Sequence, residues 1–499
     1  MKWLWVMMLF SPLFASEMSI EEKVGQLFMI PFDPSRTIEH VAEVNDVVSK
    51  YHIGGLITKA TQTQKHREVL AVLQYNRKNP LLVSVDAEWG VNMRMKECTP
   101  LPRNMTLGAI PTSVHQRVGR EIGREVRLLG AQICLGPVAD VNINPDNPII
   151  GTRSFGDSPI RCKQLVDKVS LGIKEAGVIP TLKHFPGHGA VEIDPHHDLP
   201  ICSDTITELK KSHLIPFSIL KDRSDLAVMT AHIYYPNIGK QIATFSSEII
   251  ENILRSEWGF QGLIISDALN MKALTNNYSD EEIAVNAVLA GHDILLYGDH
   301  CSDMIDEIIR EKVPKAYEAV LSAVYDGRIP ESRLDQSIRR IRLAREKADF
   351  TIYSGEIDCK KLSKELYKQA ITPIGNVPSF LGKKVLILEI GEGSYNLPFD
   401  SSKMGSLLPD LDKYDIVVGL VLSHDKQEIA RFNDILCDHK IAIVMTSPYV
   451  LQDLKRVPTL VFYENNPVTQ QLLYETVSSH PFHLSGQLPL GLPSISHLS

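Results

Sequence analysis

The sequence lacks the motifs by which several classes of protein are recognised. Its seven cysteines form no CxxC pair, are odd in number and are spread along 499 residues, which argues against a disulfide framework and a thiolate zinc site. No HExxH motif is present, so the paired-histidine helix of zinc proteases is absent. Lys and Arg number 52 against 60 Asp and Glu, for a formal net charge of −8, which argues against a nucleic-acid-binding surface.

The apolar segment at the N-terminus is too short for a transmembrane helix, which needs about 20 apolar residues. Lys2 precedes the segment, and the small residues Ala15 and Ser16 follow it. This order is typical of a secretory signal peptide, so the sequence predicts a leader over residues 1–16 and export, with a periplasmic location. The alternative is a buried N-terminal strand or helix, and the protein would then be cytoplasmic.

Short apolar runs alternate with amphipathic stretches through the first two thirds of the chain. Helical patterns separate eight β-type runs, which lie at 25–30, 53–57, 81–85, 132–138, 178–185, 226–232, 262–267 and 293–297. This alternation predicts an α/β fold, a (β/α)8 barrel of the TIM type, over residues 17–350. A doubly wound open sheet would alternate in the same way.

Polar residues fall at the ends of four of these runs and favour the barrel. Asp86, Lys183 with His184, His232 and Asp267 each end a predicted strand. A single aspartate in such a place is as well explained by capping of the next helix. Four polar strand ends are typical of a barrel that builds its active site at the carboxyl ends of its strands.

A second unit follows the barrel. Residues 351–380 are expected to form a linker and a helix, and residues 381–499 a smaller α/β domain. Its buried-type strands are predicted at 383–390, 415–423, 440–447 and 459–464. Continuous apolar runs of this kind are typical of parallel strands covered on both faces.

The stretch KHFPGHGAVEIDPHHDLP (183–200) holds four histidines and three acidic residues. A metal site is one interpretation, but Pro186 and Gly187 separate His184 from His188 and prevent the helix that would align them. A second is a structured loop whose histidines satisfy backbone groups. The third is acid/base chemistry, because Asp194 lies two residues before His196 and can fix its tautomer and basicity.

The loop resembles the signature of the β-N-acetylglucosaminidases of glycoside hydrolase family 3. KHFPGHG followed by DPH carries the resemblance, and other stretches support it: VDAEWGVNMR (85–94), PVADVN (137–142), GTRSFG (151–156), MTAHIYYP (229–236), ISDALNM (265–271) and SGQLPLGLP (485–493). The last is similar to the closing strand of two-domain members. Trp89 stands where smaller single-domain members have glycine, which leaves the length of the substrate open.

The resemblance implies a role for each matching residue. Asp267 would be the nucleophile, and His196 the general acid/base with Asp194 as its partner. The residues implied to bind the sugar are Asp86, Arg94, Arg153, Lys183 and His184, and His232 is a further candidate for the pocket wall. No metal and no cofactor is expected, and the partner is a carbohydrate.

The leading hypothesis is an exported, retaining β-N-acetylhexosaminidase that removes terminal N-acetylglucosamine from glycans such as peptidoglycan fragments. The enzymatic alternative is a family relative that acts as a β-glucosidase or as a phosphorylase on GlcNAc or glucose. A phosphorylase is compatible with the loop because a neutral imidazole donor does not repel an anionic acceptor such as phosphate. A glycan-binding barrel without activity is the third, and it predicts a broken nucleophile or dyad. The sequence leaves the aglycone, the oligomeric state and the role of the second domain open.

Overall fold

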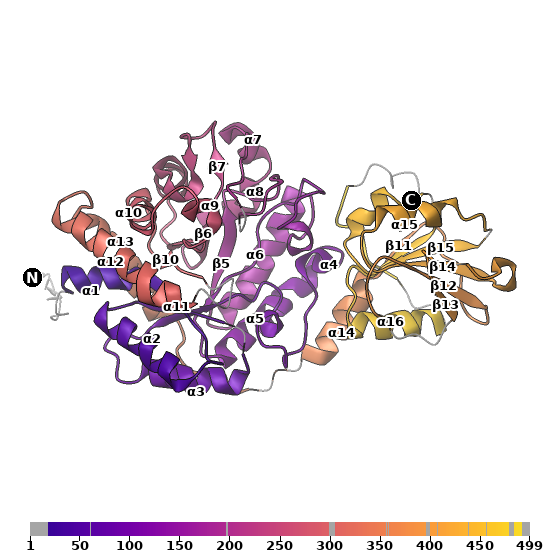
Figure 1. Ribbon diagram of the computed structural model, residues 1–499, viewed down its shortest axis with the longest axis horizontal. Coiled ribbons are helices and arrows are strands. Elements are labelled where there is room, and N and C mark those ends of the chain that lie inside the picture. The colour runs from indigo at the N-terminus through magenta and orange to yellow at the C-terminus, as the bar shows by residue number, and fades with distance from the viewer. Residues whose placement is uncertain are drawn as a thin grey trace, which may run out of the picture.

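The computed structural model describes residues 18–59, 61–195, 198–298, 305–355, 357, 359–395, 400–406, 408–437, 439–455, 457–478 and 484–491. The predicted leader (1–16) and the predicted acid/base His196 lie outside these residues. A barrel is followed by a smaller α/β domain (Figure 1), which confirms the predicted fold class.

Eight parallel strands form the barrel. The strands run in the order β10-β1-β2-β3-β4-β5-β6-β9, and a parallel bridge between Ile265 and Ile294 joins the two ends of this row. Each predicted apolar run overlaps one of these strands, and β1 and β2 extend one or two residues beyond theirs. The strands are β1 (Phe28–Phe32), β2 (Gly55–Thr58), β3 (Leu82–Val85), β4 (Ile133–Cys134), β5 (Ile179–Phe185), β6 (Ala227–Thr230), β9 (Leu263–Ser266) and β10 (Leu295–Leu296). Every residue of these strands is buried, as expected of parallel strands covered by helices.

Helices cover the outside of the barrel (Figure 1). Their apolar faces follow the helical period, as in α5, where Val118, Ile122 and Val126 are buried four residues apart. Ser279 and Glu282 form a capping box that begins α10. The helices are α1 (Ile20–Gln26), α2 (Ile38–Lys50), α3 (Thr63–Gln74), α4 (Asn104–Gly108), α5 (His115–Leu128), α6 (Pro159–Glu175), α7 (Ile206–Lys211), α8 (Leu214–Phe217), η6 (Glu248–Glu257), α9 (Lys272–Thr275), α10 (Asp280–Ala290), α11 (Ile305–Glu307), η8 (Ile308–Lys312), α12 (Val313–Tyr325) and α13 (Glu331–Lys347).

The C-terminal domain is built on a six-stranded sheet in the order β11-β16-β15-β14-β12-β13. β11 is antiparallel to β16, and the other pairs are parallel. The strands are β11 (Thr372–Ile374), β12 (Val385–Ile390), β13 (Asp400–Lys403), β14 (Ile416–Val421), β15 (Lys440–Val444) and β16 (Thr459–Val461), with helices α14 (Cys359–Ala370), α15 (Lys426–Asp434) and α16 (Pro467–Ser478). β12, β14, β15 and β16 fall within the four predicted runs, whereas β11 lies inside the stretch expected to be linker.

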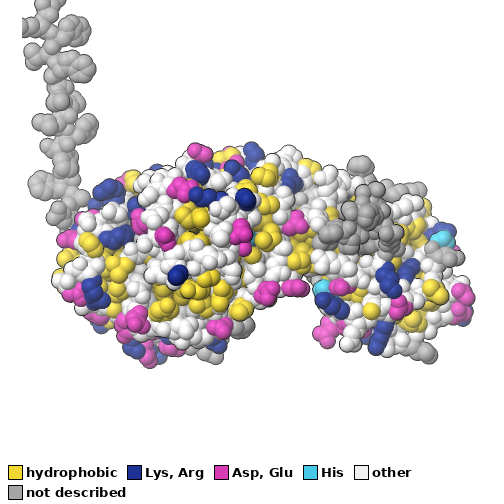
Figure 2. Space-filling model, turned by 90° about the horizontal axis from the view of Figure 1, so that it is seen from above, with side chains coloured by type: hydrophobic (Ala, Val, Ile, Leu, Met, Phe, Trp, Pro, Cys, Tyr) yellow, Lys and Arg dark blue, Asp and Glu magenta, His cyan; other side chains and the backbone are white. Residues whose placement is uncertain are grey.

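Several polar contacts join the two domains. The hydroxyl of Tyr449 donates to the carbonyl of Asn142 (2.9 Å) and accepts from its side-chain amide (2.6 Å). The segment 484–491 returns to the barrel, where the amide of Gln487 donates to the carbonyl of Ala109 (2.8 Å). Figure 2 shows the two bodies in contact, with a notch between them on one side. Within the described residues, no helix is both long and apolar enough to cross a bilayer.

Candidate active site

A cavity of about 280 Å³ lies at the mouth of the barrel. Residues at or just beyond the carboxyl ends of β3, β5 and β9 contribute to it, which is where barrel enzymes place their chemistry. Its lining combines charged side chains with apolar ones and consists of Ile57, Asp86, Glu88, Trp89, Met93, Arg94, Leu135, Ile149, Arg153, Lys183, His184, His188, Pro195, Met229, Asp267, Ala268, Met271, Leu296 and Gly298.

The cavity brings together most of the residues that the sequence singled out. Six of them line it, from four separate loops or strand ends: Asp86, Arg94, Arg153, Lys183, His184 and Asp267. Asp194 is not in the lining, although its neighbour Pro195 is. His232 is also not in the lining, and His196 lies outside the described residues.

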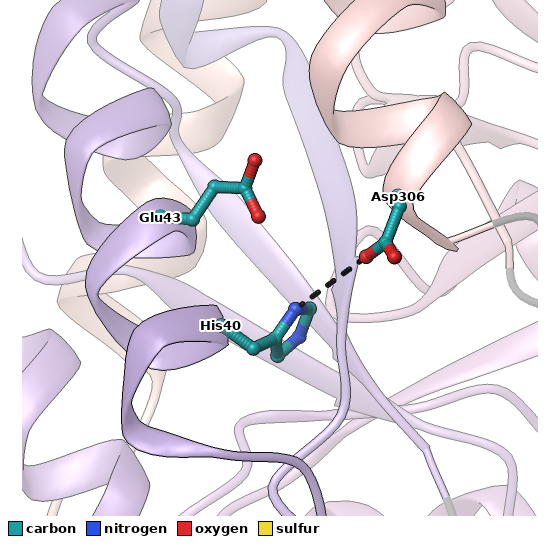
Figure 3. Close-up of side chains that lie close together, drawn as sticks. All are labelled: His40, Glu43 and Asp306. Atoms are coloured by element: carbon teal, nitrogen blue, oxygen red, sulfur yellow. Dashed lines mark ion pairs between the residues drawn. The ribbon is translucent and has the colours of Figure 1, made fainter.

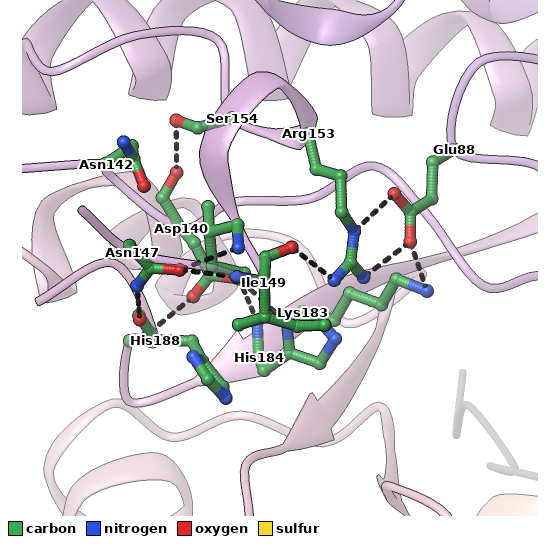
Figure 4. Close-up of polar contacts among 12 residues, drawn as sticks. Glu88, Asp140, Asn142, Asn147, Ile149, Arg153, Ser154, Lys183, His184 and His188 are labelled. Carbon is green, nitrogen blue, oxygen red and sulfur yellow. Dashed lines mark hydrogen bonds and ion pairs between the residues drawn. The ribbon is translucent and has the colours of Figure 1, made fainter. Parts of the chain in front are cut away.

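Lys183 sits at the centre of a buried ionic network (Figure 4). Its ammonium lies 3.0 Å from Asp86 Oδ1 and 2.8 Å from Glu88 Oε1. The guanidinium of Arg153 donates two hydrogen bonds, of 3.0 and 2.8 Å, to the carboxylate of Glu88. Arg94 forms an ion pair with Asp86. Three cations against two carboxylates leave one net positive charge in the wall of the cavity that Asp267 also lines.

The network keeps its carboxylates ionised in spite of burial. Burial alone would raise the pKa of Asp86, but Lys183 and Arg94 outweigh it and hold that pKa well below its usual range. Glu88 follows the same pattern: burial opposes ionisation, Arg153 and Lys183 favour it, and its pKa falls to about 2. Breaking one partner of such a buried pair costs about 3–5 kcal/mol because it leaves an uncompensated charge. The network is therefore a rigid set of donors and acceptors on the cavity wall.

Asp140, in the loop after β4, organises the histidines that follow β5 (Figure 4). It is fully buried, and one of its carboxylate oxygens accepts from the backbone amide of His184 (3.0 Å) and contacts Nδ1 of the same residue (2.7 Å). The other oxygen accepts from the backbone amide of His188 (2.7 Å). The contact between Asp140 and Nδ1 fixes the ring of His184 and directs its second nitrogen, Nε2, away from Asp140.

His188 is buried and its ring is unsatisfied. Its exposed fraction is 2 %, and neither ring nitrogen has a hydrogen-bond partner among the described residues. Burial lowers its pKa to about 4, and the neighbouring ring of His184 adds to the effect. The neutral ring lines the cavity and offers one donor and one acceptor there.

Asp267 follows directly after β9, and its Oδ1 accepts from the amide of Ala268 (2.7 Å). The position of His232 corrects the prediction that it lines the pocket. Its ring is buried behind Ala268, with Nε2 3.0 Å from that residue's carbonyl and Nδ1 2.6 Å from Thr244 Oγ1. Because both nitrogens are occupied within the protein, His232 holds the backbone beside Asp267 instead of facing the cavity.

The loop that carries Asp194 is attached to the segment after Asp267. The carbonyl of Pro195 accepts from the amide of Ala273 in α9 (3.1 Å), and the carbonyl of Asp194 accepts from the amide of Asp198 (3.2 Å). Because Pro195 lines the cavity, its neighbour Asp194 lies at the rim. The roles of Asp194 and His196 stay predictions.

One group could hold a metal ion among the residues that the structure describes, and it lies away from the cavity. His40, Glu43 and Asp306 place potential ligand atoms within 4.8 Å of one another (Figure 3). However, Arg36 lies 2.7 Å from Asp306, and Arg310 binds both oxygens of Glu43. A cation would have to displace two guanidinium groups, so this cluster is better explained as an ion-pair network.

A wider hollow of about 570 Å³ lies beside the hairpin of β7 (Tyr234–Tyr235) and β8 (Gln241–Ile242). Its described lining includes Lys240 and Tyr278 but no carboxylate. A glycosidase needs a nucleophile and a proton donor, so the smaller cavity is the candidate active site.

Sequence reasoning missed three residues of this cavity and its support: Glu88, Asp140 and His188. Glu88 and Asp140 lie inside the quoted stretches VDAEWG and PVADVN, but nothing local shows that their partners are Arg153 and His184. The burial of His188 depends on the whole mouth of the barrel. Only the presence of acidic residues after predicted strands could have pointed to the two carboxylates.

The charged side chains of this protein cluster at the carboxyl ends of the barrel strands, which is where enzymes with this fold have their active sites. The model of the Glycosyl hydrolase family 3 N terminal domain matches residues 19–344. The chain belongs to this family and is a glycoside hydrolase.

Relatives of similar sequence carry the name β-hexosaminidase. Beta-hexosaminidase A of Pseudoalteromonas piscicida is 29% identical over 374 residues, 67% of this chain and 61% of that protein, so the chain spans less than two thirds of that relative. Beta-hexosaminidase LpqI of Mycobacterium tuberculosis is 30% identical over 337 residues, 65% of this chain and 82% of the relative.

Solved structures share the two-domain architecture. A glycoside hydrolase family 3 beta-N-acetylglucosaminidase from Paenibacillus sp. superposes with a TM-score of 0.80 and 28% identity, covering 95% of this chain and 99% of the other. A beta-glucoside phosphorylase superposes with a TM-score of 0.79 at 20% identity, covering 95% and 94%. At that identity the second match shows the fold alone.

Proposed function

We propose that the chain is a retaining β-N-acetylhexosaminidase that removes terminal β-linked N-acetylglucosamine from glycans. The observation that carries the proposal is the placement of Asp267 at the end of β9, in one cavity with the Asp86–Lys183–Glu88 network. The names of the relatives, β-hexosaminidase and β-N-acetylglucosaminidase, support the choice of sugar.

The proposed chemistry uses Asp267 of the cavity and the predicted acid/base His196. Asp267 attacks the anomeric carbon and forms a glycosyl-enzyme, while His196 protonates the departing oxygen. In the second step His196 takes a proton from water, which attacks the same carbon and restores Asp267. Two inversions at one carbon give net retention of configuration.

The ionic network would bind the hydroxyl groups of the sugar. Asp86, which stays ionised, accepts hydrogen bonds from the sugar, and Lys183 and Arg94 donate hydrogen bonds to it. All three side chains line the cavity. Because the side chains are locked to one another, they are ordered before the substrate arrives, which reduces the entropy lost on binding.

We further propose that the natural substrates are peptidoglycan fragments and that the protein is exported to the periplasm. The support is the leader-like order of residues 1–16, which would bring the enzyme to the compartment where such fragments are released. Secretion of a full-length fusion to a periplasmic reporter, compared with the same fusion lacking residues 1–16, tests the location. Equal export of both would contradict it.

Hydrolysis of p-nitrophenyl β-N-acetylglucosaminide tests the activity directly. Asp267→Asn should lower kcat/KM at least about 1,000-fold, because the amide is not a nucleophile. The matched control is Asp222→Asn, an exposed aspartate in the loop before β6, which should leave kcat/KM unchanged. The β-glucoside and added phosphate serve as further arms, and turnover of neither glycoside by a folded protein would contradict the proposal.

A further inference from the structure

Glu464, in the C-terminal domain, reaches across to the barrel. Its Oε1 accepts from the backbone amide of Arg103 (2.9 Å) and from the hydroxyl of Thr106 (2.6 Å). Its Oε2 accepts from the hydroxyl of Tyr367 in α14 (3.0 Å). Arg103 precedes α4 and Thr106 lies within it, so one carboxylate from the second domain fixes the start of this short helix.

The same segment of the barrel supports two walls of the cavity. The guanidinium of Arg103 stacks 4.9 Å from the ring centre of Trp89, and the side-chain amide of Asn104 donates to the carbonyl of Arg153 (2.7 Å). Arg103 also donates to the hydroxyl of Thr152 (3.1 Å), next to Arg153. Trp89 and Arg153 both line the cavity.

These contacts leave little freedom to the segment. Asn104 and Thr106 are each 1 % exposed, so their polar groups have no water to replace a lost partner. Both carboxylate oxygens of Glu464 are already engaged. Burial raises the pKa of Glu464, while its hydrogen bonds from Thr106 and Arg103 oppose the rise. A shift of the C-terminal domain would therefore either leave these barrel groups without their partner or move α4 together with the domain.

We propose that Glu464 is a positioning residue through which the C-terminal domain sets the Trp89 and Arg153 walls of the sugar cavity. The proposal rests on the proposed function of that cavity and gives the second domain a role in substrate binding without placing one of its residues on the sugar. Trp89 is large, aromatic and held by a cation, so we infer that it is the stacking face for a sugar ring.

The kinetic test is a double-mutant cycle between Glu464 and Trp89. Glu464→Ala should raise KM for p-nitrophenyl β-N-acetylglucosaminide about two- to fivefold with a smaller change in kcat, the size expected when a cation–π contact is lost. Glu464→Gln keeps an acceptor for Arg103 and Thr106 and should restore most of the affinity. In a Trp89→Ala background the effect of Glu464→Ala should shrink, because one of the two walls is already gone.

The matched control is Glu475→Ala, which breaks a 2.6 Å pair between α16 and Lys364 of α14. This contact involves the same helix α14 that Glu464 contacts through Tyr367, but it reaches neither the barrel nor a residue of the cavity, so KM should not change. Additive effects in the Glu464/Trp89 cycle, or an unchanged KM in a folded Glu464→Ala protein, would overturn the proposal.

Fluorescence decides the question without activity, and so separates this inference from the proposed function. Trp89 is one of four tryptophans. Glu464→Ala should increase quenching by acrylamide, and the increase should vanish when Trp89→Phe is added. If the protein hydrolyses no glycoside but shows this change, the function fails and the positioning role stands. If it hydrolyses the glycoside and Trp89 is unaffected, the positioning role fails alone.

Should Glu464→Ala not fold, Thr106→Val removes one donor to Glu464 without changing the size of the side chain, and both KM and acrylamide quenching can be measured on that variant.

Discussion

His188 shows how a single side chain can be unfavourable for the fold and useful in the cavity. A buried imidazole without partners costs desolvation free energy that no hydrogen bond returns. His66, in α3, is equally buried and has no hydrogen-bond partner on either ring nitrogen among the described residues. It packs 5.4 Å from Phe32 and does not line the cavity. Comparing His188 with His66 therefore distinguishes the effect of a buried imidazole on stability from its effect on substrate binding.

We expect His188→Leu to be as stable as the wild type or more stable, and to lose about tenfold or more in kcat/KM. The first effect follows because an unsatisfied polar group leaves the interior, and the second because a donor or acceptor for the substrate is lost. Thermal unfolding and hydrolysis of p-nitrophenyl β-N-acetylglucosaminide measure the two. His66→Leu, the control, should share the first effect only. Full activity of His188→Leu would show that the ring does not contact the sugar.

At the residue scale, the sequence predicted the charged residues of the cavity better than their partners. Asp86, Lys183 and Asp267 could be found because each ends an apolar run. The pairing of Glu88 with Arg153 joins residues 65 positions apart, and no local pattern encodes it. The prediction for His232 fails for the same reason, since its contact with Ala268 exists only when β6 and β9 lie side by side.

At the scale of elements, Glu125 of α5 connects three segments. Its Oε2 accepts from the amide of Val91 (3.0 Å), in the loop that bears Arg94, and its Oε1 accepts from the thiol of Cys359 in α14 (3.4 Å). Burial raises its pKa from 4.5 to about 7. Between pH 4.5 and about 7, Glu125 keeps its proton in the folded protein but loses it in the unfolded chain. The folded state is therefore most favoured below pH 4.5, and this contribution to stability is lost as the pH rises through 7.

Glu125→Gln should remove this loss. The amide oxygen still accepts from Val91, but no charge forms, so the variant should exceed the wild type at pH 8 by on the order of 3 kcal/mol and match it near pH 4. Urea unfolding at a series of pH values measures the difference. Glu121→Gln serves as the control, because Glu121 lies one turn earlier on the same helix and is paired with Arg124. Parallel pH profiles of the wild type and Glu125→Gln would contradict the assignment.

The strands of both domains were the most predictable elements. A parallel strand covered on both faces must be apolar throughout, and that requirement marks the eight barrel strands and four strands of the C-terminal domain. β13 (Asp400–Lys403) has the sequence DSSK with a largely exposed pattern, and β11 contains a proline. Edge strands need no apolar run, so neither could be predicted.

At the scale of the whole molecule, the C-terminal segment ties the second domain back to the barrel. The carbonyl of Pro489 accepts from the amide of Asp157, and the side chain of Asp157 accepts from the amide of Gly491 (2.7 Å). Gly156 makes this approach possible: a Cβ at that position would lie 2.3 Å from the Pro489 carbonyl oxygen. The segment therefore packs directly against the loop that carries Arg153.

Gly156→Ala should displace residues 484–491 and destabilise the protein by about 3 kcal/mol or more, the sum of a strained backbone and an overlap. Gly259→Ala is the control for the backbone, because Gly259 also has a positive φ but no atom within 4 Å of its Cβ position. Hydrogen exchange at the amides of Gln487 and Gly491 should rise only in Gly156→Ala. Unchanged protection at both amides would contradict the contact.

The division into two domains was visible in the sequence, but their contacts were not. Glu464 and Arg103 are 361 residues apart, and Tyr449 and Asn142 are 307 apart. Nothing in the composition of either segment marks it as an interface. Such pairs form only when both domains are folded, so the sequence alone leaves the role of the C-terminal domain open.

The identity of the nucleophile is the central claim, and covalent trapping tests it most directly. A fluorinated N-acetylglucosaminide with a good leaving group slows the second step and lets the glycosyl-enzyme accumulate, after which peptide mass spectrometry locates the sugar. We predict an adduct of one sugar on the peptide that contains Asp267, absent from Asp267→Asn. An adduct on another carboxylate, or hydrolysis with inverted configuration and no adduct, would contradict the account.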